Sequence, residues 1–204
     1  MQIIAVLAII TLAPSLLVMV TSFVRIVIVL SLLRTAMGAQ QTPPNAVLIS
    51  LALFLTFFIM QPTLEKAYTD GILPMIEESI SEEEALGKTV EPFRGFMLQH
   101  VRDKDLDLFL GMAKITNIAT AADTPLRALI PAFMISELRR AFEIGFLLFV
   151  PFLIIDMVVA SILMSMGMMM LPPVMISLPF KLIFFVLVDG WYLVAGSLAR
   201  SFGI

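Results

Sequence analysis

The sequence predicts an all-α membrane protein, with two long apolar helical hairpins on either side of a small acidic helical insert. Hydrophobic residues make up 60% of the 204 residues and the mean hydropathy is +1.02, while charged residues make up only 14%, against roughly 25% in an ordinary soluble domain. The uncharged runs are long, with 24 residues at 1–24, 30 at 35–64 and 24 at 157–180. A helix of about 20 such residues can span a bilayer.

The first hairpin is expected at residues 1–64, with helices near 3–33 and 46–64. Met1–Val24 does not have the pattern of a signal peptide, because it lacks a basic start and a small-residue cleavage site. Its apolar core is also longer than the roughly 7–15 residues of such peptides. We therefore interpret this stretch as part of the first long helix.

The loop Arg34–Asn45 separates the two helices of this hairpin and contains Gly38, Pro43 and Pro44. The charges nearest to it, Arg25 and Arg34, are both positive. The positive-inside rule then places the loop in the cytoplasm and the acidic insert outside.

The acidic insert at residues 65–127 holds 12 acidic and 7 basic residues, so 19 of the chain's 29 charges lie in it. Ser81–Glu84 has the sequence of a capping box and predicts the start of a helix. Apolar residues at helical spacing give that helix one apolar face: Phe93, Phe96, Met97 and Val101. Asp103–Ile115 predicts a second short helix with acids in its first turn. The pattern is that of a water-facing helical cap rather than a catalytic domain.

The second hairpin is expected at residues 128–204, with apolar helices near 142–166 and 180–200. A helix from Leu129 to Met166 would have 38 residues and a length of about 57 Å, which exceeds the roughly 30 Å of a hydrocarbon core. Pro151 removes one of its hydrogen bonds and predicts a kink. This helix must project from the bilayer or be buried in protein.

A methionine-rich turn separates the helices of the second hairpin. Seven of the 15 methionines fall within 157–175, and Met168, Met169 and Met170 stand in a row. Leu171–Phe180 contains three prolines, so we expect it not to be regular helix, although it is apolar except for one serine. Apolar irregular backbone at membrane depth must be buried in protein or line a cavity.

Three interpretations of the methionine turn remain open at this point. Methionine is unbranched and adaptable, so the turn is either part of a hairpin core or a soft apolar constriction that excludes water and ions. Thioethers also bind Cu(I), but the chain has no Cys and one His to supply further ligands.

Four charges interrupt the apolar runs: Arg25, Asp156, Lys181 and Asp189. Charges in such surroundings are costly and are usually paired within the protein. Lys181 and Asp189 lie eight residues apart on one expected helix and do not face each other, so pairing across helices that fixes packing is the first interpretation. A proton or ion relay is the second, and a di-aspartyl protease built on Asp156 and Asp189 is the third, although Val-Asp-Gly-Trp differs from the Gly-x-Gly-Asp motif of that class.

Composition excludes several other classes of function. The chain has no Cys and a net charge of −3, which excludes thiol chemistry and gives no basic face for nucleic acid. No nucleotide-binding motif is present. We expect a protein that is not an enzyme and holds no metal or cofactor.

Five stretches in both apolar halves resemble one known family: Thr21–Ile26, Leu51–Met60, Ile130–Leu138, Phe149–Asp156 and Ile176–Trp191. Together they resemble the signature of the FliP family of the flagellar export gate. The virulence-type (injectisome) homologues are similar but have Ser-Pro where this chain has Pro172-Pro173, which favours the flagellar branch. Members usually carry a cleaved signal peptide ahead of the first helix, whereas this chain starts at that helix.

The resemblance implies a subunit integral to a membrane-associated oligomeric channel. Several copies would join two smaller membrane proteins, the Q and R subunits, and other export components in the flagellar basal body at the bacterial inner membrane. Much of the helical bulk would stand on the periplasmic side, and unfolded export substrates would pass through the pore. Met168, Met169 and Met170 map onto the gasket around that pore.

On this interpretation the four apolar-region charges hold the packing between helices and subunits, and Glu137 is a candidate for an inter-subunit or pore contact. Energy for export would come from other components. The alternatives are the equivalent subunit of a virulence-type secretion system and, more distantly, a methionine-based Cu(I) transporter.

Overall fold

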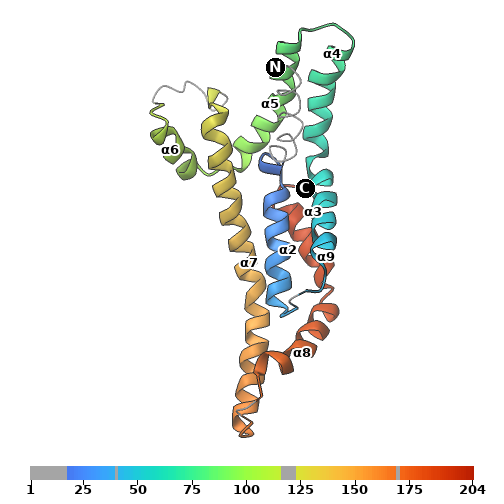
Figure 1. Ribbon diagram of the computed structural model, residues 1–204, viewed down its shortest axis with the longest axis vertical. Helices are drawn as coiled ribbons and strands as arrows, with labels where there is room; N and C mark the ends of the chain where they lie inside the picture. The colour runs from blue at the N-terminus through green and yellow to red at the C-terminus, as the bar shows by residue number, and fades with distance from the viewer. Residues whose placement is uncertain (1–17, 40, 116–122, 169–170) are drawn as a thin grey trace, which may run out of the picture. The chain divides into compact units, whose positions relative to one another are not determined.

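A computed structural model describes residues 18–39, 41–115, 123–168 and 171–204, and every regular element in these ranges is helical. In chain order the elements are α2 (Phe23–Ala36), α3 (Asn45–Ala67), the π-helical turn η1 (Tyr68–Ile72), α4 (Leu73–Ile76), α5 (Glu82–His100), α6 (Asp103–Met112), α7 (Leu126–Ser165), α8 (Pro173–Leu187) and α9 (Gly190–Arg200) (Figure 1). The prediction of an all-α protein is confirmed for the described residues.

Internal contacts divide the chain into two compact units that do not follow chain order. Unit 1 consists of Thr56–Arg139 and the residues before Arg25, and unit 2 consists of Arg25–Leu55 and Arg140–Ile204. Helices α2, α3 and α7 therefore each contribute residues to both units. The three-part division by charge and hydropathy, at 1–64, 65–127 and 128–204, stays a prediction about which segments meet water.

The start of α2 corrects the expected helix at 3–33. Residues 20–22 are not helical and α2 begins at Phe23. The hydroxyl of Thr21 accepts a hydrogen bond from the Phe23 N–H and donates one to the Val18 carbonyl, at 3.5 and 3.4 Å. Such local side-chain bonds compete with the helical ones. The expectation for residues 3–17 lies outside the described residues.

The helix that begins with α3 in unit 2 and continues into unit 1 is longer than the expected 46–64. It continues through η1 and α4 to Ile76, which makes 32 residues in all. The π-helical turn places the backbone of Gly71 against α5, where an added Cβ would lie 2.2 Å from Thr89 Oγ1 and 2.7 Å from its backbone nitrogen. Only glycine allows this close approach.

Helix α5 starts where the capping pattern predicts. The Ser81 hydroxyl accepts a hydrogen bond from the Glu84 N–H at 3.3 Å. The Glu84 side chain does not complete the box, because it pairs instead with Lys88 at 2.9 Å. The predicted N-terminal cap is thus confirmed, with one of its two expected hydrogen bonds.

The predicted apolar face of α5 packs on the first part of α7. Phe96 and Met97 are buried, whereas Phe93 and Val101 are half-buried. The ring of Phe96 lies edge-on to that of Phe133, with centroids 5.9 Å apart.

The expected over-long helix is confirmed as α7. It has 40 residues, which corresponds to about 60 Å of helix, and it continues through Pro131 and Pro151. By length and composition, Leu126–Ser165 and Asn45–Ile76 are both able to cross a membrane. Helices α8 and α9 pass the same test only as one broken span, bent by 63°.

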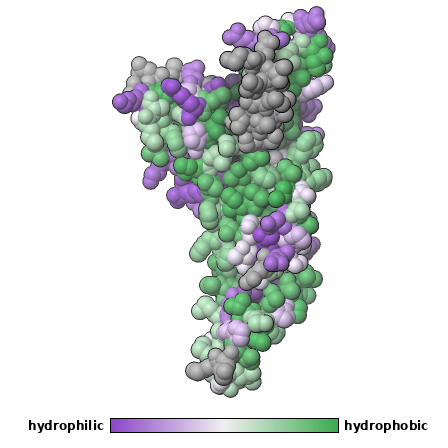
Figure 2. Space-filling model, viewed as in Figure 1, coloured by the Kyte–Doolittle hydropathy of each residue, from purple (hydrophilic) through white to green (hydrophobic). Residues whose placement is uncertain are grey.

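The two candidate spans bury little of their apolar surface within the chain. Only 22% of the most apolar part of Asn45–Ile76 and 17% of that of Leu126–Ser165 is buried. Figure 2 shows hydrophobic side chains over much of α7 and α8, and hydrophilic ones gathered over α6 and the ends of α4 and α5. Lipid or other protein chains must cover the apolar faces.

Candidate functional site: the methionine turn and the charges in unit 2

Helix α7 ends in a glycine-based C-cap that opens the methionine turn. Gly167 adopts φ +72°, a left-handed conformation that glycine accepts without strain. The Gly167 N–H donates to the Met164 carbonyl at 3.1 Å and the Met168 N–H donates to the Leu163 carbonyl at 3.0 Å. These two bonds form a Schellman motif, so the end of the helix is fixed by its own backbone.

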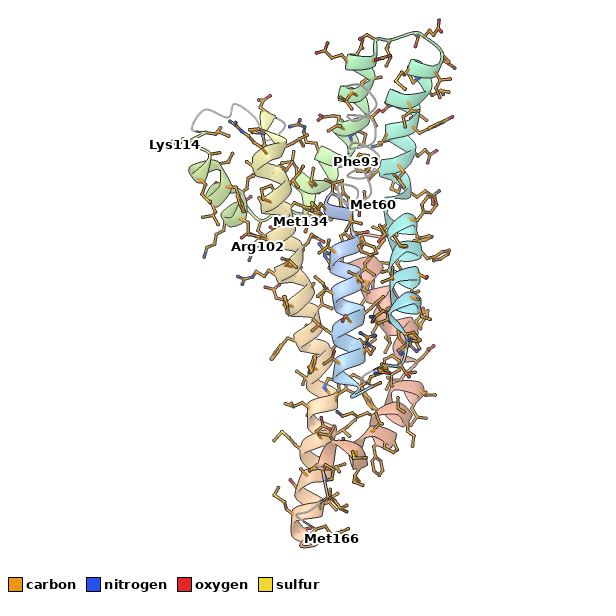
Figure 3. All side chains as sticks on the ribbon, viewed as in Figure 1. Met60, Phe93, Arg102, Lys114, Met134 and Met166 are labelled. Atoms are coloured by element: carbon orange, nitrogen blue, oxygen red, sulfur yellow. The ribbon has the colours of Figure 1, made fainter. Side chains whose placement is uncertain are left out.

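The described side chains of the turn are apolar and exposed. The exposed fraction is 66% for Met166, 39% for Met168, 41% for Leu171 and 71% for Met175. Figure 3 labels Met166 at the end of α7. The other two methionines of the candidate gasket, Met169 and Met170, lie outside the described residues.

The expectation that Leu171–Phe180 is irregular is wrong from Pro173 onward, because α8 begins there. Pro173 occupies the first helical position, where no backbone donor is needed and a φ near −65° suits the helix. Pro179 lies inside α8 and removes only one hydrogen bond. The helix thus starts within the proline-rich stretch.

The structure brings Asp156 and Lys181 together in unit 2. The Lys181 ammonium lies 2.6 Å from the Asp156 carboxylate and 3.3 Å from the Ala36 carbonyl. The lysine side chain is 4% exposed and the aspartate side chain 30%. One buried cation therefore connects α7, α8 and the end of α2.

Ser177 belongs to the same cluster, and sequence reasoning missed it. Its hydroxyl donates to the second carboxylate oxygen of Asp156. Ser177 and Lys181 are one turn apart and both are buried on α8, so they share one face. Their spacing would have shown this, had the stretch been recognised as a helix.

Arg25 lies fully buried at the start of α2 in unit 2. Its Nη1 donates to the carbonyl and the hydroxyl of Ser201 at 3.0 and 2.9 Å. The guanidinium carbon lies 3.7 Å from the centroid of the Phe202 ring, in a cation–π contact. These contacts hold the residues after α9 against α2.

Asp189 does not share a helix with Lys181, which corrects the expectation. It separates α8 from α9 with a left-handed φ of +50°, and its exposed side chain does not cap α9. The next residue, Gly190, packs against the ring of Phe185, where an added Cβ would lie 2.1 Å from the nearest ring carbon. Glycine at this position therefore allows the backbone to lie close to the ring.

Glu137 lies fully buried in the part of α7 that belongs to unit 1. Its role as an inter-subunit or pore contact stays a prediction. The same holds for the packing roles of the four charges, because the structure gives their positions and not their effects.

A second polar cluster, which sequence reasoning missed, joins α6 to α7 in unit 1. Arg102, labelled in Figure 3, donates from Nε and Nη2 to the two carboxylate oxygens of Asp105, both at 2.8 Å. The Ser136 hydroxyl donates to the same carboxylate at 2.6 Å and accepts from the Arg102 N–H at 3.1 Å. Burial alone would raise the pKa of Asp105, but the hydrogen bonds from Ser136 and Arg102, with the nearby positive charges, hold it below its usual value.

Within the ranges that the structure describes, no three His, Cys, Asp or Glu side chains gather where they could hold one metal ion. The hypothesis of a Cu(I) thioether site stays a prediction, since two of its three methionines lie outside those ranges.

The fold and the site define the class of this protein, which is an all-α membrane protein. Its candidate spans expose most of their apolar surface. In unit 2, Lys181 pairs with Asp156 and Arg25 contacts Ser201 and Phe202, and the described methionines of the turn are exposed.

Comparison with known proteins identifies the family. The sequence profile of the FliP family matches residues 6–198. The chain is 63% identical over 201 residues to a protein of Caulobacter vibrioides, an alignment that covers 98% of this chain and 76% of the relative. It is 57% identical over 196 residues to a protein of Bacillus subtilis, covering 96% and 89%, and 54% identical over 198 residues to one of Aquifex aeolicus, covering 96% and 83%. All three relatives are named flagellar biosynthetic protein FliP.

The chain belongs to the FliP family, and the resemblance stated from the sequence is confirmed.

Proposed function

We propose that this chain is a pore-forming subunit of the flagellar type III protein export gate, which passes unfolded substrates across the bacterial inner membrane. The observation that carries the proposal is the family match over residues 6–198, together with relatives that are named for flagellar biosynthesis. Those names also favour the flagellar system over a virulence-type one.

The exposed apolar helices support an assembly of several copies with the Q and R subunits. Unit 2 carries two apolar grooves along α7, of about 350 and 400 Å³, one lined mainly by phenylalanines and leucines and the other mainly by isoleucines and valines. Neighbouring helices would fill such grooves. The assembly would sit in the flagellar basal body, with the acidic segment and much of the helical bulk on the periplasmic side.

In the assembled gate, the methionine turns of several copies would meet around the lumen. Their side chains are unbranched and adapt to what passes, and a ring of apolar side chains excludes water and ions. The exposure of Met166 and Met168 supports this role, since a hairpin core would bury them.

Gene replacement tests the export role. The chain would replace the matching 201-residue region of the Caulobacter vibrioides relative, with swimming and secreted flagellin as readouts. Export-dependent swimming is expected. A chimaera that reaches the membrane at normal levels but exports no flagellin would refute the proposal.

Conductance tests the gasket. Replacing Met168, Met169 and Met170 with alanine should raise ion leak through the assembled gate in planar bilayers. A control variant with alanine at Met112 and Met157, two exposed methionines outside the turn, should leave the leak at the level of the unmodified gate. An intact assembly with the triple substitution and no added leak would remove the gasket from the proposal.

A further inference from the structure

The end of unit 1 at α4 and the first turns of α5 carries an apolar groove with an acidic rim. It measures about 540 Å³, and its lining residues are Met75, Glu82, Glu83, Ala85, Leu86 and Thr89. We call it the acid-rimmed groove. Its volume suits a few side chains of a partner rather than the face of a folded domain.

Apolar side chains at this groove are exposed although the segment around it is acidic. The exposed fraction is 39% for Met75, 64% for neighbouring Ile76 and 66% for Leu86. Met75 and Leu86 come from different helices, α4 and α5, and both line the groove. An exposed apolar patch with a polar rim is typical of an interaction site.

The rim has an unbalanced charge. Residues 77–88 contain five glutamates and one lysine, a net charge of −4 (1 − 5). Lys88 is held by Glu84 at 2.9 Å. The other four glutamates, Glu77, Glu78, Glu82 and Glu83, make no ion pair with the residues that the structure describes. Their field favours a positively charged partner.

We propose that the acid-rimmed groove binds a short basic amphipathic helix of another protein. Apolar side chains at i, i+3 and i+4 of that helix enter the groove beside Met75 and Leu86, and its lysines or arginines face Glu82 and Glu83. A second copy of the chain in a symmetric contact would set the same negative rim against itself. Lipid phosphates would meet the same repulsion, so charge complementarity selects a basic partner.

A peptide titration tests this proposal without using export activity, so its outcome is independent of the proposed function. The probe is a labelled synthetic helix of about 14 residues, or four turns, with leucine on one face and lysine on the other. The full chain is placed in nanodiscs of zwitterionic lipid, and empty nanodiscs are the reference. A second peptide with glutamate in place of every lysine controls for apolar adhesion.

Two variants and a matched control separate charge from apolar contact. Glu82→Gln with Glu83→Gln removes two rim charges and should weaken binding roughly threefold to tenfold. Leu86→Asn should weaken it about tenfold. Asp103→Asn with Asp107→Asn removes two exposed charges of α6 and should change the affinity less than twofold. Circular dichroism checks that each variant is folded.

The expected result is saturable binding of the lysine peptide alone, which weakens with salt and with both groove variants. Equal binding of the glutamate peptide, an equal loss in the α6 control, or no binding above that to empty nanodiscs would overturn the proposal.

Discussion

We predict that removing Asp156 from the Asp156–Lys181 pair lowers the free energy of unfolding more than removing Lys181 does. Asp156→Asn removes the negative charge beside the ammonium of Lys181 and leaves it only neutral acceptors, such as the Ala36 carbonyl, while the lysine side chain is only 4% exposed. Removing one partner of a buried pair costs roughly 3–5 kcal/mol. Because the Asp156 side chain is 30% exposed, the pair is partly hydrated and we expect about 3 kcal/mol, at the lower end of that range.

The opposite substitution should cost less. Lys181→Met leaves a carboxylate that water reaches and that still accepts from Ser177, so about 1–2 kcal/mol is expected. The double variant should cost no more than Asp156→Asn alone, because methionine no longer needs an acceptor. Partners in direct contact are expected to be non-additive in this way.

Thermal unfolding in detergent, followed by far-UV circular dichroism, measures these differences. A loss of 3 kcal/mol corresponds to a decrease of about 6–12 °C in Tm for a chain of this size. Asp189→Asn is the matched control, since the same chemical change at an exposed aspartate should stay within about 0.5 kcal/mol. Equal shifts for the two asparagine variants, or costs that simply add in the double variant, would refute the reasoning.

Three further predictions concern unit 1. Because the pKa of Asp105 is held below its usual value, the ionised carboxylate stabilises the fold at pH values above that usual pKa, and this stabilisation is lost as pH falls through the lower pKa of the folded state. Acid unfolding should therefore begin below about pH 4, and Asp105→Asn should reduce the slope of stability against pH there; an unchanged slope would contradict this assignment. Gly71→Ala should cost about 1–3 kcal/mol, because the new methyl meets the Thr89 backbone; a Tm equal to that of the unmodified chain would show that η1 can move away. Ser81→Ala should lower the free energy of unfolding by about 0.5–2 kcal/mol, because it removes the cap of α5. Ser81→Asp keeps a capping oxygen and should retain most of the stability of the unmodified chain in the same thermal assay.

The parts of the fold that were predictable depend on local signals. The length of α7 follows from an apolar run that no glycine-rich break interrupts, and the start of α5 follows from Ser81 three residues before Glu84. Each signal lies within one continuous stretch of the sequence. The two errors in the second hairpin have local causes as well, since Pro173 starts a helix as readily as it stops one. The dipeptide Asp189-Gly190 is a turn signal that apolar surroundings concealed.

The candidate site was predictable only in outline. Asp156 and Lys181 could be singled out because charged residues are rare in apolar runs. Their pairing, however, depends on how α8 packs against α7. The hydroxyl of Ser177 and the contacts of Arg25 with Ser201 join residues 21 and 176 positions apart. Such contacts form through tertiary packing, which leaves no periodic trace in a sequence.

The reach of Lys181 to Ala36 also has a consequence for the order of folding. Ala36 ends α2, and the last carbonyls of a helix lack partners within it and carry a partial negative charge. The ammonium that caps this end comes from a residue 145 positions later in the chain. A chain made from its N-terminus therefore leaves α2 without this cap until α8 has been synthesised, so the last turn of α2 gains its cap only after α3 to α7 have been made.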